Sequence, residues 1–120
     1  MTLTIIGAGP GGYETAVAAA AKGIEVNLVS FGPLGGTCLN EGCIPTKALC
    51  RAAEVYEDIR RAGEFGVSMP DGFNPGFDMQ KAVGRKDAVV DQLRGGIEFL
   101  MKNKLIHLYY GKASFKDAHT

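Results

Sequence analysis

Two cysteines, Cys38 and Cys43, lie in a segment whose residue types favour thiol chemistry. Four residues separate them, so an oxidised pair would close a small disulfide ring that stores two electrons. Five steps of ideal helix would place their Cα atoms about 7.5 Å apart, whereas a disulfide needs about 4.4–6.8 Å. The backbone must therefore depart from regular helix here, and Gly42 and Pro45 are residues that allow it.

The composition is that of one globular domain in a reducing compartment. The chain has 120 residues, of which 46% are hydrophobic and 22% charged, and its formal net charge is zero. Zero net charge gives no reason to expect nucleic acid or an anionic membrane as a partner. No signal-peptide pattern opens the chain and no apolar run is long enough to span a membrane. We therefore expect a cytoplasmic protein.

A redox-active pair is the favoured interpretation of the cysteines, and three others stay open. A structural disulfide is uncommon in the cytoplasm. A zinc site needs about four ligands, and only Cys50, His107 and His119 could join the pair, so we expect no metal. Plain buried cysteines fit poorly with the flanking glycines and proline. A helix N-terminus also lowers the pKa of a thiol, which would favour disulfide exchange.

A glycine-rich segment near the N-terminus predicts a turn that binds a dinucleotide, although the pattern alone could be a simple turn. Gly7, Gly9 and Gly12 follow apolar residues and precede an alanine-rich stretch. In this pattern the first glycine makes a tight turn and the second lets a pyrophosphate approach the backbone. The third lets helix and strand pack closely, and the helix N-terminus offers N–H groups to the phosphates.

The acidic residue that completes this pattern is missing. A carboxylate about 20 residues further on normally grips the adenosine ribose. Ser30 stands there instead, at the end of the second expected strand. A hydroxyl makes one neutral hydrogen bond, whereas a carboxylate accepts charge-assisted bonds that are about twice as strong. We therefore expect Ser30 to contribute weakly to binding.

The elements that position these groups alternate between strand and helix. Apolar and glycine patterns predict strands over Thr2–Gly7, Glu25–Val29 and Leu105–Tyr110, and a helix over Tyr13–Lys22. Another strand is expected to begin within Ala113–His119. The fold class is therefore α/β, a partial Rossmann-like domain with a parallel sheet.

A long helical hairpin is predicted between the second and third strands. Apolar residues recur at steps of three and four over Ala48–Ile59 and again over Met79–Leu100, with Asp78 as the cap of the second helix. Turn signals in Glu64–Gly76 separate the two helices. We interpret the apolar stripe of the second helix as core packing. Cys50 is expected to be a small core residue, and the two histidines ordinary strand and terminal residues.

The segment Gly35–Leu49, which contains both cysteines, closely resembles the dihydrolipoamide dehydrogenase family. These are flavin-dependent disulfide reductases, related to glutathione and mercuric reductases. The resemblance extends less specifically to Arg51–Val67, Val83–Leu93 and Lys112–Thr120. Thr46 favours the lipoamide branch, because glutathione reductases commonly have a second lysine there.

The resemblance implies a flavin domain with a redox disulfide. Cys38 would be the interchange thiol that meets dihydrolipoamide on a lipoyl carrier protein, and Cys43 would be the thiol beside the flavin. Lys47 would lie near the reactive flavin nitrogen. Electrons would then pass from dihydrolipoamide through the pair and FAD to NAD. The residues that would contact FAD are Gly7, Gly9, Gly12, Gly36, Thr37, Lys47 and, weakly, Ser30.

The chain departs from this family in two residues and in length. The family has glutamate at Ser30 and usually leucine at Cys50. Its members are several times longer, with a second FAD-contacting segment, an NAD domain and an interface domain that gives a His–Glu pair to the partner subunit. We interpret residues 1–120 as the N-terminal part of an FAD-binding domain, inactive alone and prone to homodimerise or exchange strands. A non-catalytic module without flavin, and a fragment of a mercuric or glutathione-type reductase, remain alternatives.

Overall fold

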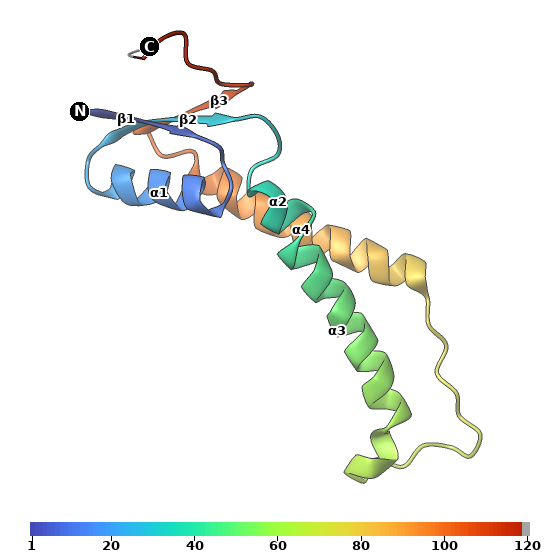
Figure 1. Cartoon of the computed structure of the whole chain (residues 1–120). Coiled ribbons are helices and arrows are strands. Elements are labelled where there is room, and N and C mark those ends of the chain that lie inside the picture. Colours follow the sequence, from blue (N-terminus) through green and yellow to red (C-terminus); the bar gives the residue numbers. More distant parts are fainter. Residues whose placement is uncertain (119–120) are drawn as a thin grey trace.

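The computed structural model describes residues 1–118, which form a small sheet, one helix beneath it and a long helical arm (Figure 1). The strands are β1 (Thr2–Ile6), β2 (Glu25–Ser30) and β3 (Ile106–Tyr110). The helices are α1 (Pro10–Ala21), α2 (Gly36–Asn40), α3 (Cys43–Arg60), the 3-10 helix η1 (Ala62–Phe65) and α4 (Met79–Leu100). All pairings in the sheet are parallel, in the order β1-β2-β3, which confirms the predicted α/β class.

The core lies between one face of the sheet, α1 and the end of α4. Val26 and Leu28 of β2 are completely buried, because α1 presents alanines that let the helix lie close to the sheet. Ile97 and Met101 bring the carboxyl end of α4 into the same cluster. The buried residues of this core are Ala8, Ala16, Ala19, Ala20, Val26, Leu28, Leu34, Leu39, Ile97, Met101 and Ile106.

Three predictions about the elements need correction. α1 begins at Pro10 rather than Tyr13, because proline suits the first helical position, where its missing N–H is not needed. The cysteine segment, expected as a loop, contains the short helix α2. No strand forms over residues 113–118, where Phe115 is 79% exposed and therefore adds little buried apolar surface to hold a strand in place. His119 lies outside the described residues.

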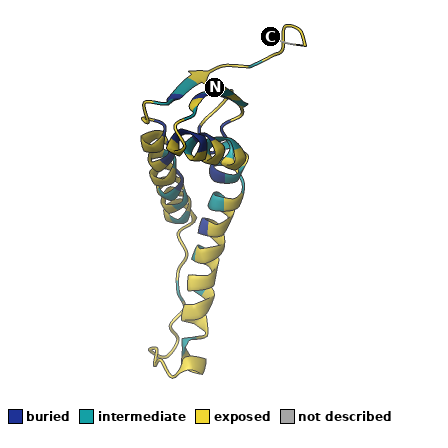
Figure 2. Cartoon of the chain, turned by 90° about the vertical axis from the view of Figure 1, so that its left-hand side faces the viewer, coloured by how far each residue is buried: buried dark blue, intermediate teal, exposed yellow. Residues whose placement is uncertain are grey.

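The α3–α4 hairpin forms an arm that extends away from the sheet, as Figures 1 and 2 show. The radius of gyration is 21.0 Å, whereas a compact chain of this length would have about 14 Å. Asp78 caps α4 as predicted, with its carboxylate accepting a hydrogen bond from the Lys81 N–H at 3.0 Å. An edge-on contact between Tyr56 and Phe77 joins α3 to the loop before α4. None of the helices within residues 1–118 is long and apolar enough to cross a membrane.

The apolar stripe of α4 is only partly core, which corrects our interpretation of it. Val90 and Ile97 are buried, but Met79 is 62% exposed and Leu93 is 43% exposed. The amino half of α4 belongs to the arm, so its stripe faces α3 and solvent instead of the sheet. Burial in Figure 2 is accordingly concentrated at the end of the molecule that holds the sheet and α1, and the far end of the arm is exposed.

The second face of the sheet is bare within residues 1–118. Ile6, Val29 and Tyr109 pair in register across the three strands and point away from α1. Ile6 is 56% exposed and Tyr109 is 53% exposed. Parallel sheets normally bury both faces, so this row is an apolar surface without a cover among the described elements.

Packing between α1 and the turn after β1 depends on Gly12. A Cβ atom at this position would lie 1.8 Å from the Gly7 carbonyl oxygen, a distance that no side chain can adopt. At neighbouring Gly11 a Cβ would meet nothing within 4 Å. We predict that Gly12→Ala lowers the free energy of unfolding by about 2–3 kcal/mol, whereas Gly11→Ala leaves it unchanged or raises it by up to about 1 kcal/mol. Chemical denaturation of both variants measures this, and equal stabilities would contradict it.

The bare sheet face predicts self-association through a second copy of the chain. We expect light scattering to show a dimer at micromolar concentration, and Tyr109→Lys to return the protein to monomer, because burying an ammonium group is unfavourable. Phe65→Lys, a similar change at the exposed tip of the arm, is the control and should leave the dimer intact. A wild type that stays monomeric over a wide concentration range would refute the prediction.

Candidate functional site

The predicted dinucleotide turn is formed by the end of β1 and the start of α1. Gly7 has a φ of +103°, which side chains other than hydrogen rarely tolerate, and its N–H donates to the Val29 carbonyl at 2.8 Å. Gly9 is the N-cap of α1. The tight turn and the close helix–strand contact expected of Gly7 and Gly12 are therefore both present.

The cysteine segment lies directly against this turn. The Gly35 N–H donates to the Ala8 carbonyl at 2.9 Å. A Cβ atom at Gly36 would lie 2.8 Å from the Gly9 Cα, so only glycine fits where the two loops meet. Two segments that are far apart in the sequence are thus joined backbone to backbone, and the thiols that follow Gly36 are held beside the dinucleotide turn.

Cys38 and Cys43 lie on two different helices. Cys38 is in the middle of α2, which ends at Asn40, and Cys43 is the first residue of α3. The break predicted from the disulfide geometry occurs at Gly42, whose φ of −119° and ψ of −107° are not helical. Pro45 falls in the first turn of α3, as expected. The departure from regular helix is therefore confirmed, and both thiols are free in this structure.

The two thiols are close enough to influence each other. A side-chain hydrogen bond with Cys43 is the main cause that raises the pKa of the Cys38 thiol, and partial burial and the charge of Cys43 add to it. The backbone N–H of Cys43 and the charge of Lys47 act in the opposite direction but are outweighed. For Cys38 the expected lowering of the pKa by a helix N-terminus is therefore wrong, because the hydrogen bond with Cys43 raises this pKa.

A hollow of about 410 Å³ gathers most of the residues predicted to hold a cofactor. Gly7 and Gly9 line it from the first turn, and Gly36 and Thr37 from the cysteine segment. Ser30 closes it from the end of β2. Gly12 and Lys47 are not in the lining: Gly12 acts through packing against Gly7, and Lys47 is exposed on α3, one turn after Cys43.

The Ser30 side chain is buried, and its hydroxyl already has a hydrogen-bond partner within the protein. It is 3% exposed, and its Oγ donates a hydrogen bond to the Gly32 carbonyl at 2.8 Å. The hydroxyl hydrogen is therefore used by the turn after β2, and the oxygen is left only as an acceptor. Glu41 places a carboxylate on the lining of the same hollow. No pattern in the sequence singles out Glu41.

Cys50 does not lie in the core. It is exposed on α3, where Ala48 is the buried residue, so the expectation of a small core cysteine is wrong. The cause is that α3 leaves the sheet soon after its first turn.

His107 lies on the bare sheet face, where its Nε2 is 2.9 Å from Glu25 Oε1. This partnership lowers the pKa of the Glu25 carboxyl and fits an ordinary strand residue, as predicted.

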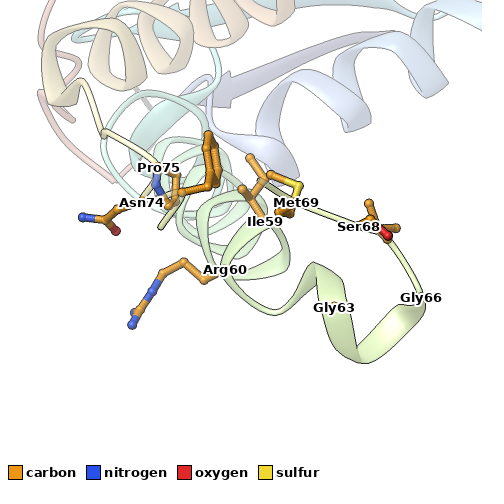
Figure 3. Close-up of a pocket in the computed structure, with 10 residues that line it drawn as sticks. Ile59, Arg60, Gly63, Gly66, Ser68, Met69, Asn74 and Pro75 are labelled. Atoms are coloured by element: carbon orange, nitrogen blue, oxygen red, sulfur yellow. The ribbon is translucent and has the colours of Figure 1, made fainter. Parts of the chain in front are cut away.

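Further hollows lie away from the predicted cofactor residues. A larger one, of about 640 Å³, is at the tip of the arm and is lined by Ile59, Met69, Phe73 and Pro75 among others. Figure 3 shows Arg60 and Asn74 extending outward from it, and no cysteine lines it. A smaller hollow of about 250 Å³ is lined by apolar residues and Cys38. The Cys38 side of the pair therefore borders an apolar space.

Asn40 and Arg94 are site residues that the sequence did not reveal. Arg94 of α4 donates two hydrogen bonds to Asn40 Oδ1, at 3.0 Å from Nε and 2.8 Å from Nη2. The two residues are 54 positions apart, and no local pattern links them. The only feature of the sequence that could have drawn attention to Asn40 is its position between the two cysteines.

The chain is similar in sequence to curated dihydrolipoyl dehydrogenases. The dihydrolipoyl dehydrogenase of Bacillus subtilis is 50% identical over 115 residues, which cover 96% of this chain and 25% of that protein. The dihydrolipoyl dehydrogenase of Acholeplasma laidlawii is 44% identical over 117 residues, covering 98% and 34%. The chain thus spans 25% to 34% of the length of these curated relatives.

A solved structure and a family model agree with this. The HOCl-induced flavoprotein disulfide reductase RclA from Escherichia coli matches with a TM-score of 0.74 and 30% identity, covering 96% of this chain and 22% of that one. The family model of the pyridine nucleotide-disulphide oxidoreductases matches residues 1–120. The chain therefore belongs to the pyridine nucleotide-disulphide oxidoreductase family.

Proposed function

We propose that this chain is the FAD-binding, disulfide-bearing part of a dihydrolipoamide dehydrogenase. In this proposal Cys38 and Cys43 carry electrons from dihydrolipoamide toward FAD and NAD. The observation that carries it is the placement of Cys38 and Cys43, on either side of the break at Gly42, on a segment whose Gly36 packs against the dinucleotide turn. The names of the relatives support the substrate class.

The residues around the hollow fit a flavin dinucleotide. Gly9 and Gly36 leave bare backbone where a side chain would fill the space, and the N-terminus of α1 leaves N–H groups for a pyrophosphate. Thr37 adds an exposed hydroxyl, and Lys47 an exposed cation one turn beyond Cys43. When bound, FAD would supply a two-electron acceptor, while the protein supplies its placement.

The oxidised pair would exchange with dihydrolipoamide in two balanced steps. A substrate thiolate attacks the Cys38 sulfur, the disulfide breaks, and Cys43 leaves as a thiolate. The second substrate thiol then loses its proton and attacks the substrate sulfur of the mixed disulfide. Cys38 leaves, and the lipoamide disulfide closes. Two electrons have moved to the cysteine pair, and the raised pKa of Cys38 means that its thiolate readily takes up one of the released protons.

Full turnover is proposed to need more than these residues. The relatives are about three to four times as long as the matched region, so parts outside it are the proposed source of the NAD site and of the dimer interface. A lipoyl carrier protein is the proposed partner. We expect residues 1–120 alone to transfer no electrons from dihydrolipoamide to NAD.

The cysteine pair is tested by oxidation and mass spectrometry. We predict that oxidised lipoamide converts the reduced chain to a form with a Cys38–Cys43 disulfide, because the two thiols are near enough for Cys43 to raise the pKa of Cys38. Peptide mapping after alkylation of the remaining thiol identifies the bond. Cys50→Ser is the matched control and should give the same product, since Cys50 is exposed on a different turn of α3. A bond to Cys50, or no bond at all, would overturn the proposal.

Flavin binding is tested at Ser30. We predict that the chain binds FAD weakly and that Ser30→Glu tightens binding about tenfold, because a carboxylate can accept charge-assisted hydrogen bonds from the ribose. Quenching of flavin fluorescence on titration measures the dissociation constants. Ser30→Gln, which has the same shape without the charge, is the control and should not show this gain.

The other outcomes of the flavin titration are informative as well. A chain that ignores FAD in every variant would support the non-catalytic module. Unchanged affinity in Ser30→Glu would show that the missing carboxylate is compensated elsewhere. Glu41→Gln then tests whether Glu41, on the same lining, is the residue that compensates.

A further inference from the structure

The side-chain amide of Asn40 joins three segments around Cys38. Its Nδ2 donates to the Leu34 carbonyl at 3.0 Å and to the Gly36 carbonyl at 2.8 Å. Its Oδ1 accepts from Nε and Nη2 of Arg94 at 3.0 Å and 2.8 Å. The amide thus connects the loop before α2, the first residue of α2 and the distant helix α4.

The orientation of this amide is fixed by the chemistry of its partners. A guanidinium group only donates hydrogen bonds and a carbonyl only accepts them, so the amide oxygen must face Arg94 and the amide nitrogen must face the two carbonyls. The Arg94 side chain is 30% exposed, and its Nη1 also contacts Asp91 at 3.0 Å. Partly buried charge-assisted bonds of this kind hold more firmly than ion pairs at the open surface.

The short helix that carries Cys38 needs such an anchor. α2 has five residues, and helices of this length are not stable by themselves. Leu39, 6% exposed, anchors it to the core, and Asn40 is its last residue. Cys43 lies across the break at Gly42, on α3. The separation of the two thiols therefore depends on how firmly α2 is held.

We propose that Arg94 is a positioning residue for the cysteine pair, acting through Asn40. By holding α2 in place, it keeps Cys38 within reach of Cys43 and raises the effective concentration of one thiol at the other. Arg94 touches neither thiol in this role. The inference rests on the proposed function, because it assumes that the pair forms a disulfide.

The test measures the equilibrium of the pair with glutathione. Closing the Cys38–Cys43 disulfide releases two electrons and two protons, which reduce one glutathione disulfide to two glutathione thiols. The chain is equilibrated over a series of glutathione ratios, alkylated and analysed by mass spectrometry. For Arg94→Met we expect the equilibrium constant for disulfide formation to fall about tenfold, the equivalent of one charge-assisted hydrogen bond. Arg94→Lys, which keeps a donor, should recover part of this loss.

Matched variants separate positioning from general destabilisation. Arg85→Met is the same change on the same helix, where the side chain lines a hollow between α3 and α4 and does not reach Asn40. It should leave the equilibrium constant unchanged. Asn40→Ala should lower the constant at least as much as Arg94→Met does, because it also removes the bonds to the Leu34 and Gly36 carbonyls. Adding Arg94→Met to Asn40→Ala should lower the constant no further, because Arg94 acts through Asn40. Thermal unfolding of each reduced variant is recorded in parallel.

The outcomes distinguish the two proposals. If the wild-type chain forms no Cys38–Cys43 disulfide, the proposed function fails and this inference with it. Two results would overturn only the positioning role, provided that the wild type forms the bond. One is an Arg94→Met variant with the same equilibrium constant as the wild type. The other is an Arg85→Met variant whose constant falls as far as that of Arg94→Met. If Arg94→Met shows no cooperative unfolding, Asn40→Ala decides: a constant equal to that of the wild type would overturn the role.

Discussion

The contact between the loops at Gly9 and Gly36 is the constraint on which the rest of the site depends. A side chain on Gly36 would collide with the Gly9 backbone, so the loops can meet only as bare main chain. Their contact is reinforced by the hydrogen bond from the Gly35 N–H to the Ala8 carbonyl at 2.9 Å. It places a thiol-bearing helix next to a turn suited to phosphate groups, so that a cofactor held by one would lie beside the other. A dinucleotide turn and a redox pair come together in one site because glycine stands at position 36, where a Cβ would lie 2.8 Å from the Gly9 Cα.

Buried and exposed apolar surfaces divide the molecule into two parts. The sheet, α1 and the end of α4 share one core, whereas most apolar side chains of the arm remain exposed. α4 belongs to both parts, since Ile97 is buried under the sheet while Met79 is 62% exposed. Arg94 lies on the stretch of α4 where the helix passes from core to arm. Its hydrogen bonds to Asn40 therefore connect α2 to the point of α4 where the arm begins.

Local patterns in the sequence were enough to predict the strands, the long helices and the glycine turn. Their periodicity and caps act over a few residues, which is why Asp78 could be identified as a cap and Gly12 as a packing position. The hydrogen bonds from Arg94 to Asn40 could not be predicted, because they join residues 54 positions apart. Burial was misjudged for Cys50 and for the amino half of α4, since a regular apolar stripe does not tell whether anything covers it. The pKa of Cys38 depends on a second thiol, whose distance only the fold defines.

The link between η1 and α4 has a consequence for the integrity of the chain. Residues 67–78 contain neither helix nor strand, and all of them except Pro75 are exposed. Exposed, irregular backbone of this kind is where proteases cut first. A single cleavage there would leave the thiols on one piece and Arg94 on the other, with the pieces still sharing the sheet core through Leu28, Ile97 and Ile106. The nicked molecule would then be a noncovalent complex of two peptides, able to dissociate and reassemble.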